Sequence, residues 1–61
     1  MKIIAGDNLA RDIVSDVLVC SDVNEYYGSR IVEMLNDEQG ALAPWYYRLV
    51  PDDHVLYKWQ P

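Results

Sequence analysis

The alternation of side chains in residues 45–59 predicts a β-hairpin. Two runs rich in aromatic and β-branched residues flank a Pro-Asp-Asp turn at residues 51–53, where proline presets φ and the aspartates can hydrogen-bond nearby backbone groups. A three-residue loop places Tyr47 opposite Tyr57. Because successive strand residues point to opposite faces, this register gathers six side chains on one core face: Trp45, Tyr47, Leu49, Val55, Tyr57 and Trp59.

A period close to 3.6 residues predicts one main helix over residues 22–37. Ser21 or Asp22 is expected to cap it, and Asp22 with Glu25 three positions later forms a capping-box pattern. The apolar pattern ends at Leu35, and only polar residues and a glycine follow as far as position 40. One face of this helix should meet the hairpin; it consists of Val23, Tyr27, Ile31, Met34 and Leu35, with Tyr26 and Val32 on its flanks.

Gly28 lies inside this predicted helix, where glycine costs about 1 kcal/mol relative to alanine. Two explanations fit its presence. The first is close packing beneath the ring of Trp45 or Trp59, which we favour, and the second is the approach of a partner's backbone.

The first twenty residues contain one clear element and one ambiguous one. Residues 2–5 predict an edge strand that the Gly-Asp-Asn sequence at 6–8 terminates. Residues 9–20 have a helical stripe of apolar positions, but they also carry β-branched residues that favour a strand. The two interpretations are evenly balanced; if only the first half is helical, residues 17–20 would join the sheet.

These patterns together predict an α+β fold in a single domain, residues 1–61. It should contain a small antiparallel sheet built on the C-terminal β-hairpin, with the helix of about residues 22–37 packed on one face and an N-terminal strand added. A chain of 61 residues buries only ~60% of the surface that its unfolded form exposes. Its core should therefore be thin, and oligomerisation would add stability.

The sequence also predicts a soluble, cytoplasmic protein. Half of the residues are hydrophobic, too many for a disordered chain, yet no apolar run approaches the ~20 residues of a membrane span. The N-terminus lacks the apolar segment of a signal peptide. Cys20 is the only cysteine, which excludes an internal disulfide and fits a reducing compartment.

Candidate chemistry is sparse, so we expect no enzyme activity, no cofactor and no metal site. The chain has one histidine and no glycine-rich phosphate loop, zinc-ligand spacing or nucleophile elbow. Asp52, Asp53 and His54 are consecutive turn residues, whose side chains diverge rather than converge on an ion. A reactive thiol at Cys20 is conceivable near a helix start, but a small buried cysteine is the commoner case.

Charge is the one global property with functional weight. Ten carboxylates against five basic residues give a net charge of −5, which disfavours direct binding to nucleic acid or to anionic membranes. The same field attracts basic proteins, although a moderate negative charge can also serve solubility alone. Tyrosine and tryptophan, which dominate many protein interfaces, account for seven residues.

The main functional hypothesis is a binding module that inhibits a basic nucleic-acid-handling protein by mimicking nucleic acid. In size, charge and lack of catalytic residues the chain resembles, by type and without a family motif, the small acidic inhibitors encoded by phages, including anti-restriction and anti-CRISPR proteins. The alternative is a self-associating structural module, with a homodimer formed through the sheet. Candidate partner-binding residues are Asp12, Asp16, Glu33, Asp37, Glu38, Tyr46 and Arg48.

Overall fold

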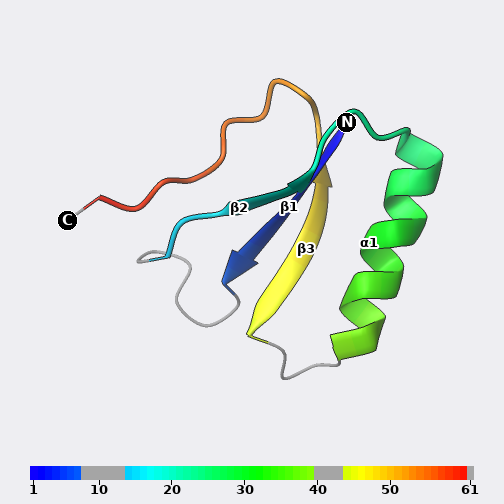
Figure 1. Cartoon of the computed structure of the whole chain (residues 1–61), viewed down its shortest axis with the longest axis horizontal. Helices are drawn as coiled ribbons and strands as arrows, with labels where there is room; N and C mark the ends of the chain where they lie inside the picture. The colour runs from blue at the N-terminus through cyan, green and yellow to red at the C-terminus, as the bar shows by residue number, and fades with distance from the viewer. Residues whose placement is uncertain (8–13, 40–43, 61) are drawn as a thin grey trace.

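The computed structural model describes residues 1–7, 14–39 and 44–60 and contains three strands and one helix in this part of the chain (Figure 1). The elements are β1 (Lys2–Asp7), β2 (Val17–Cys20), α1 (Glu25–Gln39) and β3 (Trp45–Val50). The strands form one antiparallel sheet in the order β2-β1-β3, and α1 packs mainly on β3. The predicted α+β class is confirmed.

The N-terminal strand β1 occupies the centre of the sheet, so its expected place at the edge is wrong. It pairs with β3 along its whole length, from Lys2 opposite Val50 to Asp7 opposite Trp45. Ile3 and Ile4 point to opposite faces and are both 0% exposed. A strand with apolar residues on both faces is typical of a position covered from both sides, and this pattern explains the central placement.

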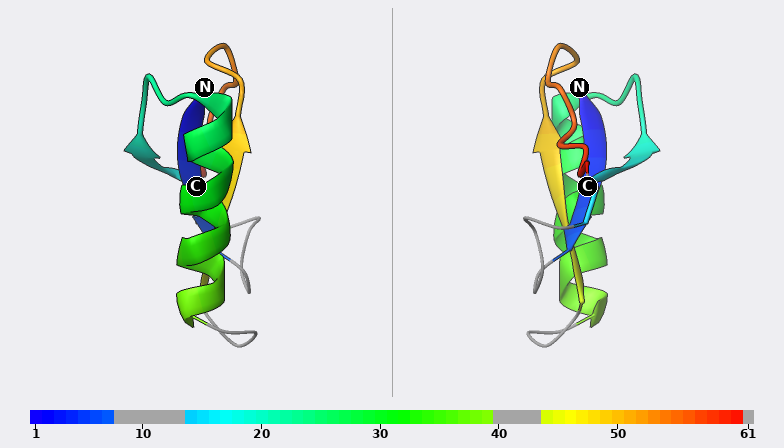
Figure 2. Two further views of the ribbon diagram at one scale, coloured as in Figure 1. Left: turned by 90° about the vertical axis from the view of Figure 1, so that its right-hand side faces the viewer. Right: turned by 90° about the vertical axis from the view of Figure 1, so that its left-hand side faces the viewer.

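The sheet is covered by α1 on one face and by residues 54–60 on the other (Figure 2). Leu49 contacts the helix at Gly28, and Ile3 lies directly opposite Leu49 in the ladder, so Ile3 faces α1. Ile4 therefore faces the C-terminal segment. His54 and Leu56 of that segment are half-buried.

The predicted hairpin forms its turn but not its second strand. The His54 N–H donates to the Pro51 carbonyl at 3.0 Å, which closes the turn, yet residues 54–60 have no strand structure. Tyr57 instead exchanges two hydrogen bonds with Asp16: its N–H donates to Asp16 Oδ2 at 3.0 Å, and its carbonyl accepts from the Asp16 N–H at 2.9 Å. The Trp59 N–H donates to Ser15 Oγ at 2.9 Å.

Two physical reasons account for this correction. One edge of β3 is paired with β1, with Tyr47 opposite Ala5, and on the other edge the Asn36 side chain holds the N–H and the carbonyl of Tyr47. The face of the sheet that carries Ile4 also needs a cover, which the C-terminal segment provides. As a result Val55, Tyr57 and Trp59 are exposed instead of forming the core.

The ambiguous segment is resolved in its second half only. Residues 17–20 are the strand β2 and join the sheet, as expected if only the first half of residues 9–20 were helical. Residues 8–13, including the stretch that would have formed the short helix, lie outside the described residues.

The helix begins later than predicted and is capped by a different residue. Asn24 Oδ1 accepts the N–H groups of Tyr26 and Tyr27 at 2.7 and 3.3 Å, the geometry of an N-cap. Asp22 has a positive φ of 58°, so it lies in the turn before the helix, and the capping box from Asp22 to Glu25 does not form.

The buried face of α1 is rotated by about one residue from the expected face. It runs through Gly28, which is buried, and Val32 and Leu35, which are half-buried. Tyr27 and Met34, expected in the core, are 64% and 61% exposed. The position of Gly28 explains the rotation because the helix approaches the sheet most closely where no side chain intervenes.

Close packing at Gly28 is confirmed, but the packing partner is not a tryptophan ring. A Cβ at this position would lie 2.7 Å from Leu49 Cδ1 and 3.4 Å from Val23 Cγ2. The first distance is shorter than van der Waals contact allows. A Cβ at this position would therefore force the Leu49 side chain to shift.

The free edge of β3 is occupied by the side chain of Asn36. The Tyr47 N–H donates to Asn36 Oδ1 at 2.9 Å, and Asn36 Nδ2 donates to the Tyr47 carbonyl at 3.0 Å. The side-chain amide thus pairs with the strand as a neighbouring strand would, and it joins the helix to the sheet.

The close approach at Gly28 predicts that the effect of Gly28→Ala on the free energy of unfolding changes sign when Leu49 is shortened to alanine. Gly28→Ala gains up to about 1 kcal/mol of helix propensity, but overpacking against Leu49 costs about 1–3 kcal/mol, so we expect net destabilisation in urea melts. In a Leu49→Ala background the same substitution should stabilise the protein. Stabilisation of the unmodified protein by Gly28→Ala would contradict the observed packing.

The paired amide predicts an unusual pH dependence for Asn36→Asp. A carboxylate repels the Tyr47 carbonyl, so the pKa of the new group should be raised in the folded state, whereas a protonated carboxyl can both donate and accept. Stability relative to Asn36→Ala should therefore be highest below the unfolded pKa of about 3.9 and fall as pH rises through the folded pKa. Denaturant melts of both variants across this range measure the difference, and a constant difference would contradict the contact.

Candidate protein-binding surface

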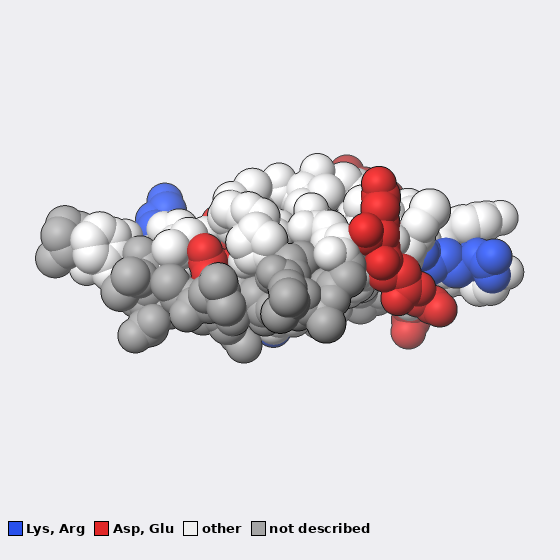
Figure 3. Space-filling model, turned by 90° about the horizontal axis from the view of Figure 1, so that it is seen from below, with Lys and Arg blue, Asp and Glu red and all other residues white. Residues whose placement is uncertain are grey.

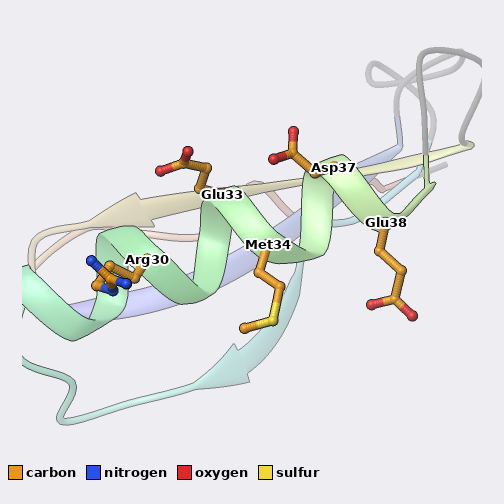
Figure 4. A pocket seen from close by; sticks show the side chains of 5 residues that line it. All are labelled: Arg30, Glu33, Met34, Asp37 and Glu38. Atoms are coloured by element: carbon orange, nitrogen blue, oxygen red, sulfur yellow. The ribbon is translucent and has the colours of Figure 1, made fainter.

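Three carboxylates gather on the exposed surface of α1 near its C-terminal end. Glu33, Asp37 and Glu38 are all exposed, and the view of the lower end of the molecule shows carboxylates gathered over this part of the helix (Figure 3). Glu33 and Asp37 project to one side of α1 and Glu38 to the other (Figure 4). These three residues, here called the acidic cluster, include three of the seven predicted partner-binding positions.

The electrostatics of the acidic cluster oppose the stability of the helix. Glu33 and Asp37 are four residues apart, a spacing at which like charges repel by a few tenths of a kcal/mol. Asp37 and Glu38 also lie at the end of α1, where the helix dipole is negative and cations are favoured. The last turn has no basic residue. A cationic partner would relieve both effects.

Exposed apolar and aromatic side chains accompany the acidic cluster along α1. Tyr26 is 62% exposed, and its ring meets that of Tyr27 edge to face, with centroids 5.1 Å apart. The Arg30 guanidinium lies 5.6 Å from the centroid of Tyr26. Met34 is also exposed, so this surface offers the residue types that supply binding energy in protein interfaces.

An open depression of about 730 Å³ connects the two kinds of side chain. It is lined by Arg30, Glu33, Met34, Asp37 and Glu38 (Figure 4). Its single basic residue, Arg30, lies one turn before Met34. Glu33 lies between Arg30 and Asp37 along the helix, and Asp37 and Glu38 lie toward its C-terminal end (Figure 4). A shallow, mixed surface of this kind suits another protein better than a small molecule, which binds in enclosed pockets.

The remaining predicted residues do not join the acidic cluster. The carboxylate of Asp16 is half-buried and holds the backbone of Tyr57, so it has a structural role. Tyr46 and Arg48 lie on the face of the sheet opposite α1 and are half-buried. The Arg48 guanidinium carbon lies 5.9 Å from the centroid of the Tyr46 ring. Asp12 lies outside the described residues.

Sequence reasoning missed the aromatic and apolar part of this surface because it placed Tyr27 and Met34 in the core. The signal that could have found them was Gly28. If the glycine had been taken as the point of closest approach, the buried stripe would have been centred on Gly28, Val32 and Leu35, and the other apolar residues would have fallen outside it.

No family model matches the chain, and comparison with curated proteins and with solved structures gave no significant match. Within the described residues, no three of the histidine, cysteine, aspartate and glutamate side chains are grouped to hold a metal ion. The helix of the described part, α1, has 15 residues, and no helix there could span a membrane.

The opposition between the acidic cluster and helix stability predicts that Asp37→Lys stabilises the protein. The substitution replaces repulsion from Glu33 by attraction in the favourable orientation and places a cation at the negative end of the dipole. We expect a gain of about 0.5–1 kcal/mol at low salt. The control is Asp53→Lys, an equal charge change in the exposed turn after β3. Thermal melts should show no comparable gain in stability for this control. Equal shifts in melting temperature for the two variants would contradict a local effect at the helix end.

Proposed function

We propose that the protein is a small binding module that acts by occupying a basic protein, and that the exposed side of α1 is its contact surface. The observation that carries this proposal is the exposed acidic cluster near the C-terminal end of α1, where the last turn has no basic residue and like charges and the helix dipole are unfavourable. Groups that oppose stability are common at functional sites. Solubility alone would not need these charges at this position.

The chemistry of the surface fits a protein partner with basic side chains around an apolar contact. Tyr26, Tyr27 and Met34 supply exposed apolar area, and Glu33, Asp37 and Glu38 lie around or beyond it. Aromatic residues and methionine dominate binding energy, while charges at the rim set the association rate and the choice of partner. Nothing in this arrangement requires a catalytic step, so the effect on the partner is steric.

Proteins that handle nucleic acid are the partner class that this charge suits best. Their binding channels carry lysine and arginine that neutralise phosphates, and a chain with a net charge of −5 competes for the same side chains. The protein would then act as an inhibitor that mimics nucleic acid, in the manner of the acidic phage-encoded inhibitors.

Charge reversal within the acidic cluster tests this proposal. Glu33→Lys with Asp37→Lys should weaken binding to the partner at least about tenfold and slow association most, because charges at the rim of an interface steer the two proteins together. This steering should decrease with added salt, since exposed charges are screened within ~8 Å at physiological salt. The matched control is Asp22→Lys with Asp53→Lys, which changes the net charge equally at exposed positions outside the acidic cluster. Asp52 is left unchanged because it pairs with the N-terminal ammonium at 3.0 Å.

The partner can be found with the same pair of variants. The unmodified protein and both variants are immobilised and exposed to extracts of the native host, and mass spectrometry identifies a basic protein retained by the unmodified protein and the control but not by the cluster variant. The purified complex should weaken with added salt and be displaced by duplex DNA. Binding that survives the cluster reversal, or is insensitive to both salt and DNA, would contradict the proposal.

A further inference from the structure

The two edges of the sheet differ in how they are protected. At β3, the side-chain amide of Asn36 occupies the N–H and the carbonyl of Tyr47. At β2, no strand in the described part of the chain pairs with the outer edge. Proteins usually protect such edges because exposed backbone groups recruit further strands. Among the described residues, β2 is therefore the edge that offers a place for another strand to pair.

The side chains of β2 favour association at this edge. The strand reads Val-Leu-Val-Cys and contains none of the charged residues or prolines that usually discourage pairing. Val17, Leu18 and Val19 are 48%, 50% and 42% exposed. Exposed apolar side chains therefore accompany an outer edge that no strand of residues 1–7, 14–39 and 44–60 covers.

We propose that β2 pairs with β2 of a second copy of this chain and joins the two sheets into one. A two-fold axis perpendicular to the sheet makes the two β2 strands antiparallel and puts the same face of both sheets on the same side. Residues that lie opposite each other must then point to the same face of the joined sheet. With the axis at Leu18, this residue lies opposite its own copy, and Val17 lies opposite Val19. The joined sheet has six strands with both α1 helices on one face.

A groove beside β2 becomes continuous in this arrangement. Val17 and Val19 line an open groove of about 260 Å³ together with Ala5, Trp45 and Tyr47. The two-fold axis places the groove of the second copy next to it, so the valines of both copies form a shared apolar floor. This burial adds side-chain contacts to the backbone ladder.

Several observations favour a second copy over a segment of another protein. The strand is self-complementary because both edges of the new ladder would carry the same apolar side chains. The described part of the chain has only four buried hydrophobic residues, Ile3, Ile4, Ala5 and Val50, so each copy gains from further burial. The flanking carboxylate of Asp16 is bonded to Tyr57 rather than projecting unpaired into the contact.

The sheet geometry also limits the strength of the dimer. Ile3 pairs with Cys20 and Ile4 with Leu18, so Val19 is an extra residue in β2 at a register shift. Bulges increase twist, which confines the new ladder to about three residues. A contact of this size lies below the ~1,200 Å² of standard interfaces, and we expect a dimer that forms only at high protein concentration.

Sedimentation equilibrium between about 5 µM and about 1 mM protein should show a reversible monomer–dimer transition. Leu18→Lys places two ammonium groups opposite each other and should weaken dimerisation at least about tenfold. Tyr26→Lys is the matched control, since it makes the same charge change at a side chain of comparable exposure on α1 and should leave the dimer unchanged. Added salt should strengthen the dimer by screening the net charges, opposite to its effect on binding to a basic partner.

Amide hydrogen exchange of the unmodified protein gives a test that does not depend on a variant. Protection of the β2 amides should rise with protein concentration, while that of Tyr47 should not change because Asn36 already holds its N–H. A monomer at every concentration, as expected if another protein supplies the added strand, would overturn the proposal. A dimer that tolerates Leu18→Lys and leaves the β2 amides unprotected would do so as well.

Discussion

The burial of β1 on both faces is the constraint on which the rest of the structure depends. Ile3 and Ile4 are adjacent, point to opposite sides of the sheet and are fully buried. A strand of this kind needs neighbours on both edges and a cover on each face. In a chain of 61 residues, this requirement uses every described element: β2 and β3 as neighbours, α1 as one cover and residues 54–60 as the other.

Meeting this constraint leaves part of the apolar surface uncovered. The helix approaches through Gly28 and joins β3 through Asn36, so it lies toward the β3 side of the sheet and leaves the groove beside β2 open. Its own outer surface carries Tyr26, Tyr27 and Met34 beside the acidic cluster. The two proposed interaction surfaces, the outside of α1 and the edge of β2, are therefore direct consequences of how a small chain covers one central strand.

The sequence predicted those features that depend on local patterns. The α+β class, the main helix, the first strand of the expected hairpin, its turn and the close packing at Gly28 all follow from periodicity and turn chemistry within short windows. The pairing of β3 does not. A hairpin and a contact with β1 satisfy the same alternation at Tyr47 and Leu49, and only the distant burial requirement of Ile4 decides between them.

The same limit applies to the candidate site. Glu33, Asp37 and Glu38 could be grouped in advance because they lie within two turns of one helix. Asp16 could not be assigned, since its carboxylate bonds to a backbone group 41 residues away. The exposure of Tyr27 and Met34 was missed because an apolar residue beside a helix's buried stripe has the same local signature as one within it.

Residues 54–60 cover the second face of the sheet instead of pairing with β3, and nuclear Overhauser contacts test this arrangement most directly. We expect backbone contacts between Asp16 and Tyr57, contacts of the Trp59 amide proton with the Ser15 side chain, and cross-strand contacts between Ala5 and Tyr47. Cross-strand backbone contacts between Tyr47 and Tyr57 would show a C-terminal hairpin and contradict it.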